Sequence, residues 1–323
     1  MNFELNEDQQ AILESVNRLL EQHAGPARAI ELNRQGLYDD KLHTLLDESG
    51  FHSIASDLAT ADKLAGLEAG LVVEAIARAG GVVASAAQML IAPAITDSSI
   101  NGPIALCTQD NLDNPVPLRF GAQARNLLVL AENEVRLIPL AAGDLVPVRS
   151  SFGYPMGRLH DTHRFSDHTA VGQSLGRKAV SAMKNWWRLS LAIEAVGTME
   201  AALNHTVEYL KQRRQFGRAI GSFQAIQHRL SLCAIRVEAS RWLTREAAYH
   251  GARDEAVAAA AAFALEAADQ VFTETHQMSG AIGFTLEFDL HVWSMRLLAL
   301  RQELQGVGGH RRALVEARWG TAL

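Results

Sequence analysis

Cysteine is nearly absent from this chain of 323 residues, which contains only Cys107 and Cys233. Two cysteines leave little for a disulfide framework and are too few for a cysteine-rich zinc site. Their scarcity fits a reducing compartment, so we expect a cytoplasmic location. A chain of this length also buries enough core to fold without disulfides or a structural metal.

An excess of positive charge is lacking as well. The net charge is −6 and the isoelectric point is about 6.1, which disfavours a nucleic-acid-binding surface. No run of about 18 apolar residues occurs, so we expect no membrane-spanning helix. The first residues lack the basic region and apolar run of a signal peptide. The 48% hydrophobic and 20% charged composition is typical of a soluble globular protein with one large domain or about two domains.

Proline is scarce except in one stretch, because six of the eight prolines lie between Pro103 and Pro155. Proline breaks helices, whereas the flanking segments are rich in the helix formers Ala, Leu, Glu and Arg. The sequence therefore predicts a mainly α fold with a small β insert. We expect an N-terminal α-helical domain over residues 1–100, a middle β-domain over 101–174 and a C-terminal four-helix bundle over 175–323.

The periodicity of apolar residues, together with the glycines and prolines that end elements, predicts the helices and strands of the first two parts. Asn6 is a candidate N-cap for a helix from Glu7 to about His23. Further helices are expected at 40–49, 61–80 and 83–97, between glycines and prolines. Short strands are expected at Ile104–Thr108, Asn126–Leu130 and Glu134–Leu140.

The sequence of the third part, residues 175–323, predicts four long helices followed by a short one. The first runs from about Arg177 to Arg213, and the second ends near His250 with Ser222 as a possible N-cap. Asp254 is the expected cap of an Ala-rich third helix that ends near Ser279. The fourth is expected from about Glu287 to Leu304. Short connections between long helices are typical of a bundle.

The common catalytic motifs are missing. No Gly-x-Ser-x-Gly elbow, P-loop or Gly-x-Gly-x-x-Gly fingerprint occurs, which disfavours an α/β hydrolase, an NTPase and a Rossmann dehydrogenase. Histidines and aspartates gather at 160–168, in the order His160, Asp161, His163, Asp167, His168. They lack a recognised ligand spacing and fit a solvated turn better, so we predict no metal site.

One run combines features of an anion-binding site. Residues 213–224 read Arg-Arg-Gln-Phe-Gly-Arg-Ala-Ile-Gly-Ser-Phe-Gln, where one helix ends and the next begins. Arg213 can pair with a phosphate, and the N-terminus of the next helix favours anions. Phe216 and Phe223 offer flat apolar surfaces to a ring. The alternative is an Arg-rich helix end with two core phenylalanines.

A second run, residues 276–287, contains Gln277, Gly280, Ala281 and Gly283, small residues that let a ligand approach the backbone. Together the two runs resemble signatures of the acyl-CoA dehydrogenase family. Arg213-x-x-Phe216-Gly217 with Phe223-Gln224 resembles its flavin segment. Gln277-x-x-Gly280-Ala281-x-Gly283-Phe284 resembles its Gln-x-x-Gly-Gly segment, with Ala281 in place of the second Gly. The stretches 3–10 and 45–51 also resemble family helices.

The resemblance implies FAD bound across a subunit interface. In the family, the flavin ring lies against the middle domain of one subunit, and the neighbouring subunit holds the diphosphate and adenosine end. The residues that would contact FAD by this resemblance are Arg213, Gln215, Phe216, Gln224, Gln277, Gly280 and Ala281.

The chain departs from the family in its middle domain and its base. Residues 105–110 match only the start of the family's flavin-ring segment, the Trp-containing strand is missing, and the middle region has about half the usual length. The catalytic Glu positions are occupied by Trp187 and by Leu304 or Gln305. Glu303 would point away from the site if its helix persisted. Glu194 remains the candidate base, unless it forms a structural ion pair.

Three functions are therefore kept open. The first is a subunit of a heteromeric (α2β2) acyl-CoA dehydrogenase, in which a longer partner supplies the catalytic Glu and the substrate is an acyl-CoA, with a steroid side chain among the candidates. The second is a homomeric enzyme whose base is Glu194. The third is a flavin-free assembly protein on the same scaffold. An electron-transfer flavoprotein is the electron acceptor that the resemblance implies.

Overall fold

The structure is a computed structural model that describes residues 4–59, 65–160 and 172–320. Its first part is helical, as expected. Asn6 caps the first helix in a reciprocal capping box with Gln9, which fixes the predicted start at Glu7. The elements are α1 (Glu7–His23), α2 (Pro26–Gln35), α3 (Asp40–Glu48), α4 (Ile54–Asp57), α5 (Gly66–Arg78), the π-helical turn η1 (Ala87–Ile91) and α6 (Ala92–Ile95).

The middle part holds two small sheets. One has the strand order β1-β3-β4-β7 and the other the order β2-β6-β5. Strands β1 and β3 pair in parallel, and their predicted bounds are those observed. The elements are β1 (Ile104–Thr108), α7 (Gln109–Asp113), β2 (Leu118–Arg119), η2 (Gly121–Gln123), β3 (Asn126–Leu130), β4 (Val135–Pro139), β5 (Leu145–Val148), β6 (Met156–Leu159) and β7 (Gln173–Ser174).

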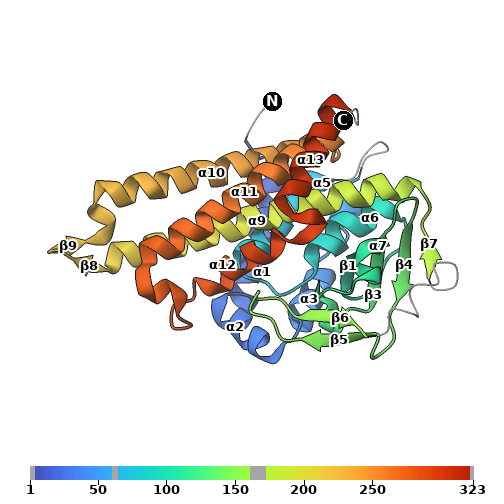
Figure 1. The fold of residues 1–323 in the computed structure, drawn as a ribbon, viewed down its shortest axis with the longest axis horizontal. Helices are drawn as coiled ribbons and strands as arrows, with labels where there is room; N and C mark the ends of the chain where they lie inside the picture. Colours follow the sequence, from blue (N-terminus) through green and yellow to red (C-terminus); the bar gives the residue numbers. More distant parts are fainter. Residues whose placement is uncertain (1–3, 60–64, 161–171, 321–323) are drawn as a thin grey trace.

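The third part is a bundle arranged around its first helix. This 35-residue helix, α9, packs against α5 of the first part and against the other bundle helices (Figure 1). Its elements are α9 (Lys178–Gln212), β8 (Arg214–Gln215), β9 (Arg218–Ala219), η3 (Ile220–Ser222), α10 (Gln224–Tyr249), α11 (Asp254–Ser279), η4 (Gly280–Phe284), α12 (His291–Leu300), η5 (Glu303–Gln305) and α13 (Gly306–Trp319). The mainly helical fold with a small β part is confirmed.

Three local predictions in the bundle were wrong. Ser222 does not cap α10, because its hydroxyl donates to the carbonyl of Ala219 and Phe223 is the cap residue. Asp254 is the first residue of α11 rather than its cap, and its carboxylate accepts a hydrogen bond from Asn185 instead. The fourth helix is shorter than expected, since regular helix spans only His291–Leu300.

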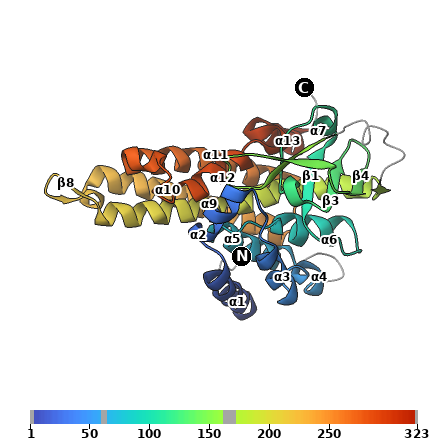
Figure 2. The same ribbon diagram turned by 90° about the horizontal axis from the view of Figure 1, so that it is seen from below.

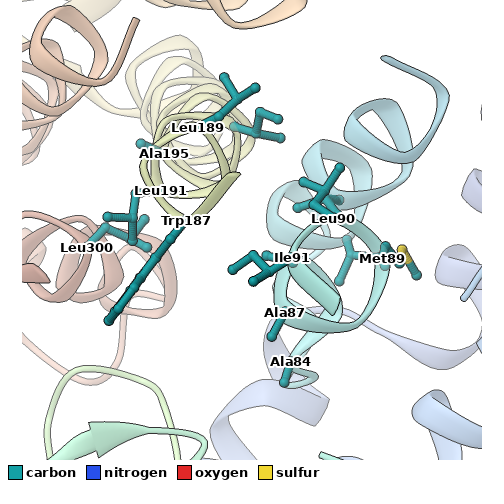
Figure 3. Packing of buried hydrophobic residues seen from close by; sticks show 14 of the residues in the cluster. Ala84, Ala87, Met89, Leu90, Ile91, Trp187, Leu189, Leu191, Ala195 and Leu300 are labelled. Carbon is teal, nitrogen blue, oxygen red and sulfur yellow. The ribbon is translucent and has the colours of Figure 1, made fainter. Parts of the chain in front are cut away.

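Glycine permits the closest approach between the first part and the bundle. A Cβ added to Gly197 of α9 would lie 2.2 Å from the backbone oxygen of Glu74 in α5. The apolar core continues along α9 from this crossing. Figure 3 shows Trp187 extending from α9 beside Leu191 and Leu300, opposite Ala87 and Ile91. The core thus joins α9, α12 and the η1 turn.

One stretch, Asp254–Phe284, is long and apolar enough to pass a test for a membrane span by length and composition alone. This stretch contains α11, which packs against α9, α10 and α13 as a core helix of the bundle. Such core helices commonly pass the same test. No group of three or more His, Cys, Asp or Glu residues suited to a metal ion occurs in the described ranges. Of the histidine cluster, only His160 is described; Asp161, His163, Asp167 and His168 lie outside the described residues.

Candidate functional site

A pocket of about 760 Å³ lies where the middle part meets the bundle. Its apolar wall comes from β1, the segment before η1 and Trp187 of α9. Its charged groups come from α7, β2, α9, η5 and α13. Among the lining residues are Ala84, Ala87, Leu106, Thr108, Arg119, Phe120, Met156, Lys184, Trp187, Arg188, Glu194, Glu303 and Arg312. A cavity of this size with apolar walls and a few polar groups is typical of a small-molecule site.

Two carboxylates and one arginine meet inside this pocket. Nη1 of Arg119 lies 2.8 Å from Oε2 of Glu194, and Nε of Arg119 donates to Oε1 of Glu303. The indole nitrogen of Trp187 donates to Oε2 of Glu303 over 2.6 Å. The side chains are 9% exposed for Arg119, 6% for Glu194 and 19% for Glu303. Segments that are far apart in the sequence, β2, α9 and η5, therefore form one buried charge cluster.

Burial and charge oppose each other in this cluster. Burial raises the pKa of Glu194 above the ordinary carboxyl value, although Arg119 acts in the opposite direction. Burial would lower the pKa of Arg119, but Glu194 and Glu303 raise it well above its usual value. Tyr154 lies 5.0 Å below the Arg119 guanidinium, and burial raises its pKa to about 12. The phenol thus stays neutral beside a charged triad.

Glu303 was expected to point away from the site only if its helix persisted, and the helix does not persist. The chain leaves the α-helical conformation at Leu304, whose φ of 50° and ψ of 44° lie in the left-handed region. Gln305 and Gly306 follow with positive φ, and the turn directs Glu303 toward Trp187. The sequence did not predict this turn, because Gly306 is the one residue in the segment whose type signals the end of a helix. Leu304 and Gln305 line the pocket without an acidic group.

Sequence reasoning did not identify Arg119 or the role of Trp187. Arg119 lies in a two-residue strand without periodicity, so nothing in its neighbours marks it as buried. Trp187 is a buried residue, with 2% of its surface exposed. Its indole N–H nevertheless reaches a carboxylate of the pocket. A buried Trp needs such a partner, and this requirement was the available signal.

The two runs with flavin-like motifs lie at the far end of the bundle. The hairpin β8–β9 projects beyond α9 and α10, and η4 ends α11 at the same end (Figure 1). The view from below also places the hairpin far from the middle-part strands (Figure 2). We call residues 213–224 and 277–286 the bundle tip. All seven predicted contact residues are exposed there: Arg213, Gln215, Phe216, Gln224, Gln277, Gly280 and Ala281.

The bundle tip presents unused polar groups and bare apolar rings. Within the described residues, the side chains of Arg213, Gln215, Gln224 and Gln277 make no hydrogen bond or ion pair. Phe216 is 90% exposed, so it is not a core residue. Phe284 and Leu286 are 74% and 78% exposed. A free guanidinium, free amides and apolar surfaces fit a ligand with phosphates and rings.

Comparisons with known proteins agree with these features. Residues 175–316 match the family described as acyl-CoA dehydrogenase, C-terminal domain. The chain is 28% identical to "Acyl-CoA dehydrogenase IpdE2" of Mycobacterium tuberculosis, over 97% of this chain and 98% of the relative. The chain is therefore similar to acyl-CoA dehydrogenases, and its residues 175–316 match the C-terminal domain of that family.

Two solved structures have the same fold. The chain superposes on a structure described as "Tcur3481-Tcur3483 steroid ACAD G363A variant" with a TM-score of 0.79 and 22% identity, over 96% of this chain and 97% of that one. It superposes on the "ChsE4-ChsE5 complex from Mycobacterium tuberculosis" with a TM-score of 0.74 and 22% identity, over 97% of both chains. At 22% sequence identity, these superpositions are evidence for a shared fold.

Proposed function

We propose that this chain is a subunit of an FAD-dependent acyl-CoA dehydrogenase and that its bundle tip binds the diphosphate and adenosine end of a FAD shared with a neighbouring subunit. The observation that carries the proposal is the distance between tip and pocket. Arg213 follows Glu194 by 19 residues along α9, which is about 28 Å at 1.5 Å per residue. A ligand end held by Arg213 therefore belongs to another subunit's pocket.

The residues at the tip suit this role. The Arg213 guanidinium would neutralise diphosphate charge, and Gln215, Gln224 and Gln277 would donate or accept hydrogen bonds. Gly280 has a φ of 67° and open space around its Cα, so the backbone there is accessible to a ligand. Phe216 would pack on an apolar edge of the cofactor. Bound FAD would supply the hydride acceptor for α,β-dehydrogenation of an acyl thioester.

We further propose that the neighbouring subunit is a longer partner in a heteromer and that this partner supplies the catalytic Glu. Two observations support it. Glu194 and Glu303, two of the four carboxylates that line this chain's pocket, are both engaged by Arg119. The chain also shares its fold with a protein described as a complex of two different chains. The proposed substrate is an acyl-CoA, with a steroid side chain among the candidates. The proposed location is the cytoplasm, with an electron-transfer flavoprotein as acceptor.

A second candidate is a homomeric enzyme whose base is Glu194. The specific observation in its favour is that Glu194 lines the pocket with a raised pKa, as a general base near neutral pH requires. The two candidates share the FAD arrangement and differ in which subunit carries the base. A flavin-free assembly protein on this scaffold is the third outcome.

Expression of the chain alone, and together with a longer acyl-CoA dehydrogenase subunit, separates these functions. We expect the isolated chain to lack stoichiometric FAD and the co-purified complex to contain it, with oxidation of an acyl-CoA. Stoichiometric FAD and turnover in the isolated chain would instead support the homomeric enzyme. Absence of flavin absorbance in every combination would exclude both flavin-dependent functions.

A further inference from the structure

The carboxylates that meet at Arg119 differ in how firmly each is held. Glu303 has both oxygens occupied, one by Arg119 and the other by the Trp187 indole at 2.6 Å. Glu194 has only Oε2 occupied, by Nη1 of Arg119 at 2.8 Å. Within the described residues, Oε1 of Glu194 accepts no hydrogen bond, and Glu194 lines the pocket. One carboxylate is therefore fixed through both oxygens, whereas the other lines the pocket and has one oxygen without a hydrogen bond.

Their surroundings also differ in solvent access. Glu194 sits in the middle of α9 and is 5% exposed, and burial raises its pKa. Glu303 lies on the η5 turn, where its side chain is 19% exposed. Burial penalises a charge most where water is excluded and hydrogen bonds are fewest. Glu194 is therefore the carboxylate that accepts a proton more readily.

The cluster remains balanced when Glu194 takes up a proton. Arg119 then keeps Glu303 as a charged partner, so no buried guanidinium is left unpaired. Without Glu303, the same protonation would leave the Arg119 charge alone in a largely buried site, which is strongly unfavourable. A second carboxylate thus removes the penalty for protonating the first.

We propose that Arg119 is a positioning residue for proton abstraction in this pocket, with Glu303 as its permanent counter-ion and Glu194 as the carboxylate that accepts the proton. In the step, the C–H bond at the α-carbon of a bound acyl thioester breaks and an O–H bond forms on Glu194. The electron pair would become the new C=C bond, and bound flavin would supply the acceptor that takes the β-hydrogen as a hydride. The inference rests on the second candidate of the proposed function, in which this chain carries the base.

The chain offers a matched control for removing a buried arginine. Arg241 also bridges carboxylates, at 2.8 Å from Glu74 and 2.9 Å from Glu200. Its side chain is 9% exposed, the same fraction as that of Arg119. Neither Arg241 nor its partners line the pocket. Arg241→Met therefore reports the loss of a buried ion pair without touching the pocket cluster.

The first experiment needs neither flavin nor substrate. Infrared difference spectra of the full chain are recorded during acid titration, and the band of protonated buried carboxyl groups is followed. We expect Glu194→Gln to remove the first such band and Glu303→Gln to retain it at lower pH. In Arg119→Met the band should appear one to three pH units higher, and Arg119→Lys should restore the parent titration in part. Loss of the band in Glu303→Gln alone would reverse the two roles and overturn the inference. An unchanged titration in Arg119→Met would overturn it as well.

The second experiment uses the flavin-loaded assembly with an acyl-CoA that it oxidises. We expect Glu194→Gln to lower kcat by about 100- to 10,000-fold. Arg119→Met should move the acid limb of the pH–kcat profile upward, with little change in KM, and Arg241→Met should leave that limb in place. Parent-like kcat in Glu194→Gln would overturn the base assignment, so that a partner supplies the base. The infrared result still decides the roles within the cluster, which separates failure of this inference from failure of the proposed function.

Discussion

A single arginine at the bundle tip is expected to dominate the contact with FAD. Arg213 ends α9, is exposed and has no partner among the described side chains. Hydrogen bonds to charged groups contribute about 1.5–3 kcal/mol. Arg213→Ala should therefore weaken FAD binding by the assembled protein about 10- to 100-fold, as measured by flavin fluorescence titration.

An exposed arginine elsewhere provides the control for this measurement. Arg34 lies on the surface of α2, far from the tip in sequence. Arg34→Ala should leave the FAD dissociation constant within about twofold, which corresponds to a small surface effect. Equal losses in both variants would mean that Arg213 acts only through net charge.

A buried histidine behind the pocket makes stability depend on pH. His310 is 0% exposed, and burial lowers its pKa from 6.5 to about 4, with Arg188 acting in the same direction. Between these values the unfolded chain binds a proton that the folded chain does not, so stability falls as pH decreases from about 6.5 to 4. This residue should cost about 2 kcal/mol of unfolding free energy at pH 5 relative to pH 7.

Substitution of His310 tests this linkage directly. In His310→Gln the loss of stability between pH 7 and pH 5 should shrink by about 2 kcal/mol, as measured by urea unfolding at each pH. His228→Gln, at an exposed position of α10, should keep the parent slope. Identical slopes in the parent and in His310→Gln would show that His310 does not control the acid sensitivity.

At the scale of elements, the crossing of α5 and α9 depends on one glycine. Gly197→Ala would place a methyl group 2.2 Å from a backbone oxygen that cannot rotate away. The helices must separate, and overpacking of this kind costs about 1–3 kcal/mol of unfolding free energy. Gly308→Ala in α13 is the control, because its nearest atom is the end of the Arg312 side chain at 3.7 Å. That variant should gain up to about 1 kcal/mol from helix propensity. Equal stability of the two variants in chemical denaturation would exclude a tight crossing.

The elements also show which features a sequence reveals. Capping at Asn6 and the strands at 104–108 and 126–130 follow from local signals, and the structure has them where they were expected. The turn at Leu304 could not be predicted from local signals. A Leu with positive φ is held in that conformation by its surroundings rather than by its own backbone preference. The convergence of Arg119, Glu194 and Glu303 likewise depends on tertiary packing of segments up to 184 residues apart. The tip motifs were visible because both of them are contiguous in sequence.

At the scale of the whole molecule, the exposed apolar groups of the tip point to an assembly. Phe216 and Leu286 are 90% and 78% exposed in the single chain. Burying a large apolar side chain contributes about 1.5–3 kcal/mol. The double variant Phe216→Ser, Leu286→Ser should therefore raise the dissociation constant of the assembly by at least about tenfold and lower its flavin content. Analytical ultracentrifugation and the flavin absorbance of the purified complex measure both effects.

Because these side chains are so exposed, the same double variant should unfold at nearly the parent denaturant concentration. Leu37→Ser, which is 41% exposed in the first part of the chain, is the matched control and should leave assembly and flavin content unchanged. Parent-like assembly in the tip variant would exclude the tip as an interface, and a FAD shared through Arg213 would then be untenable. Loss of assembly with retained flavin would place the cofactor inside a single subunit, contrary to the separation of tip and pocket along α9.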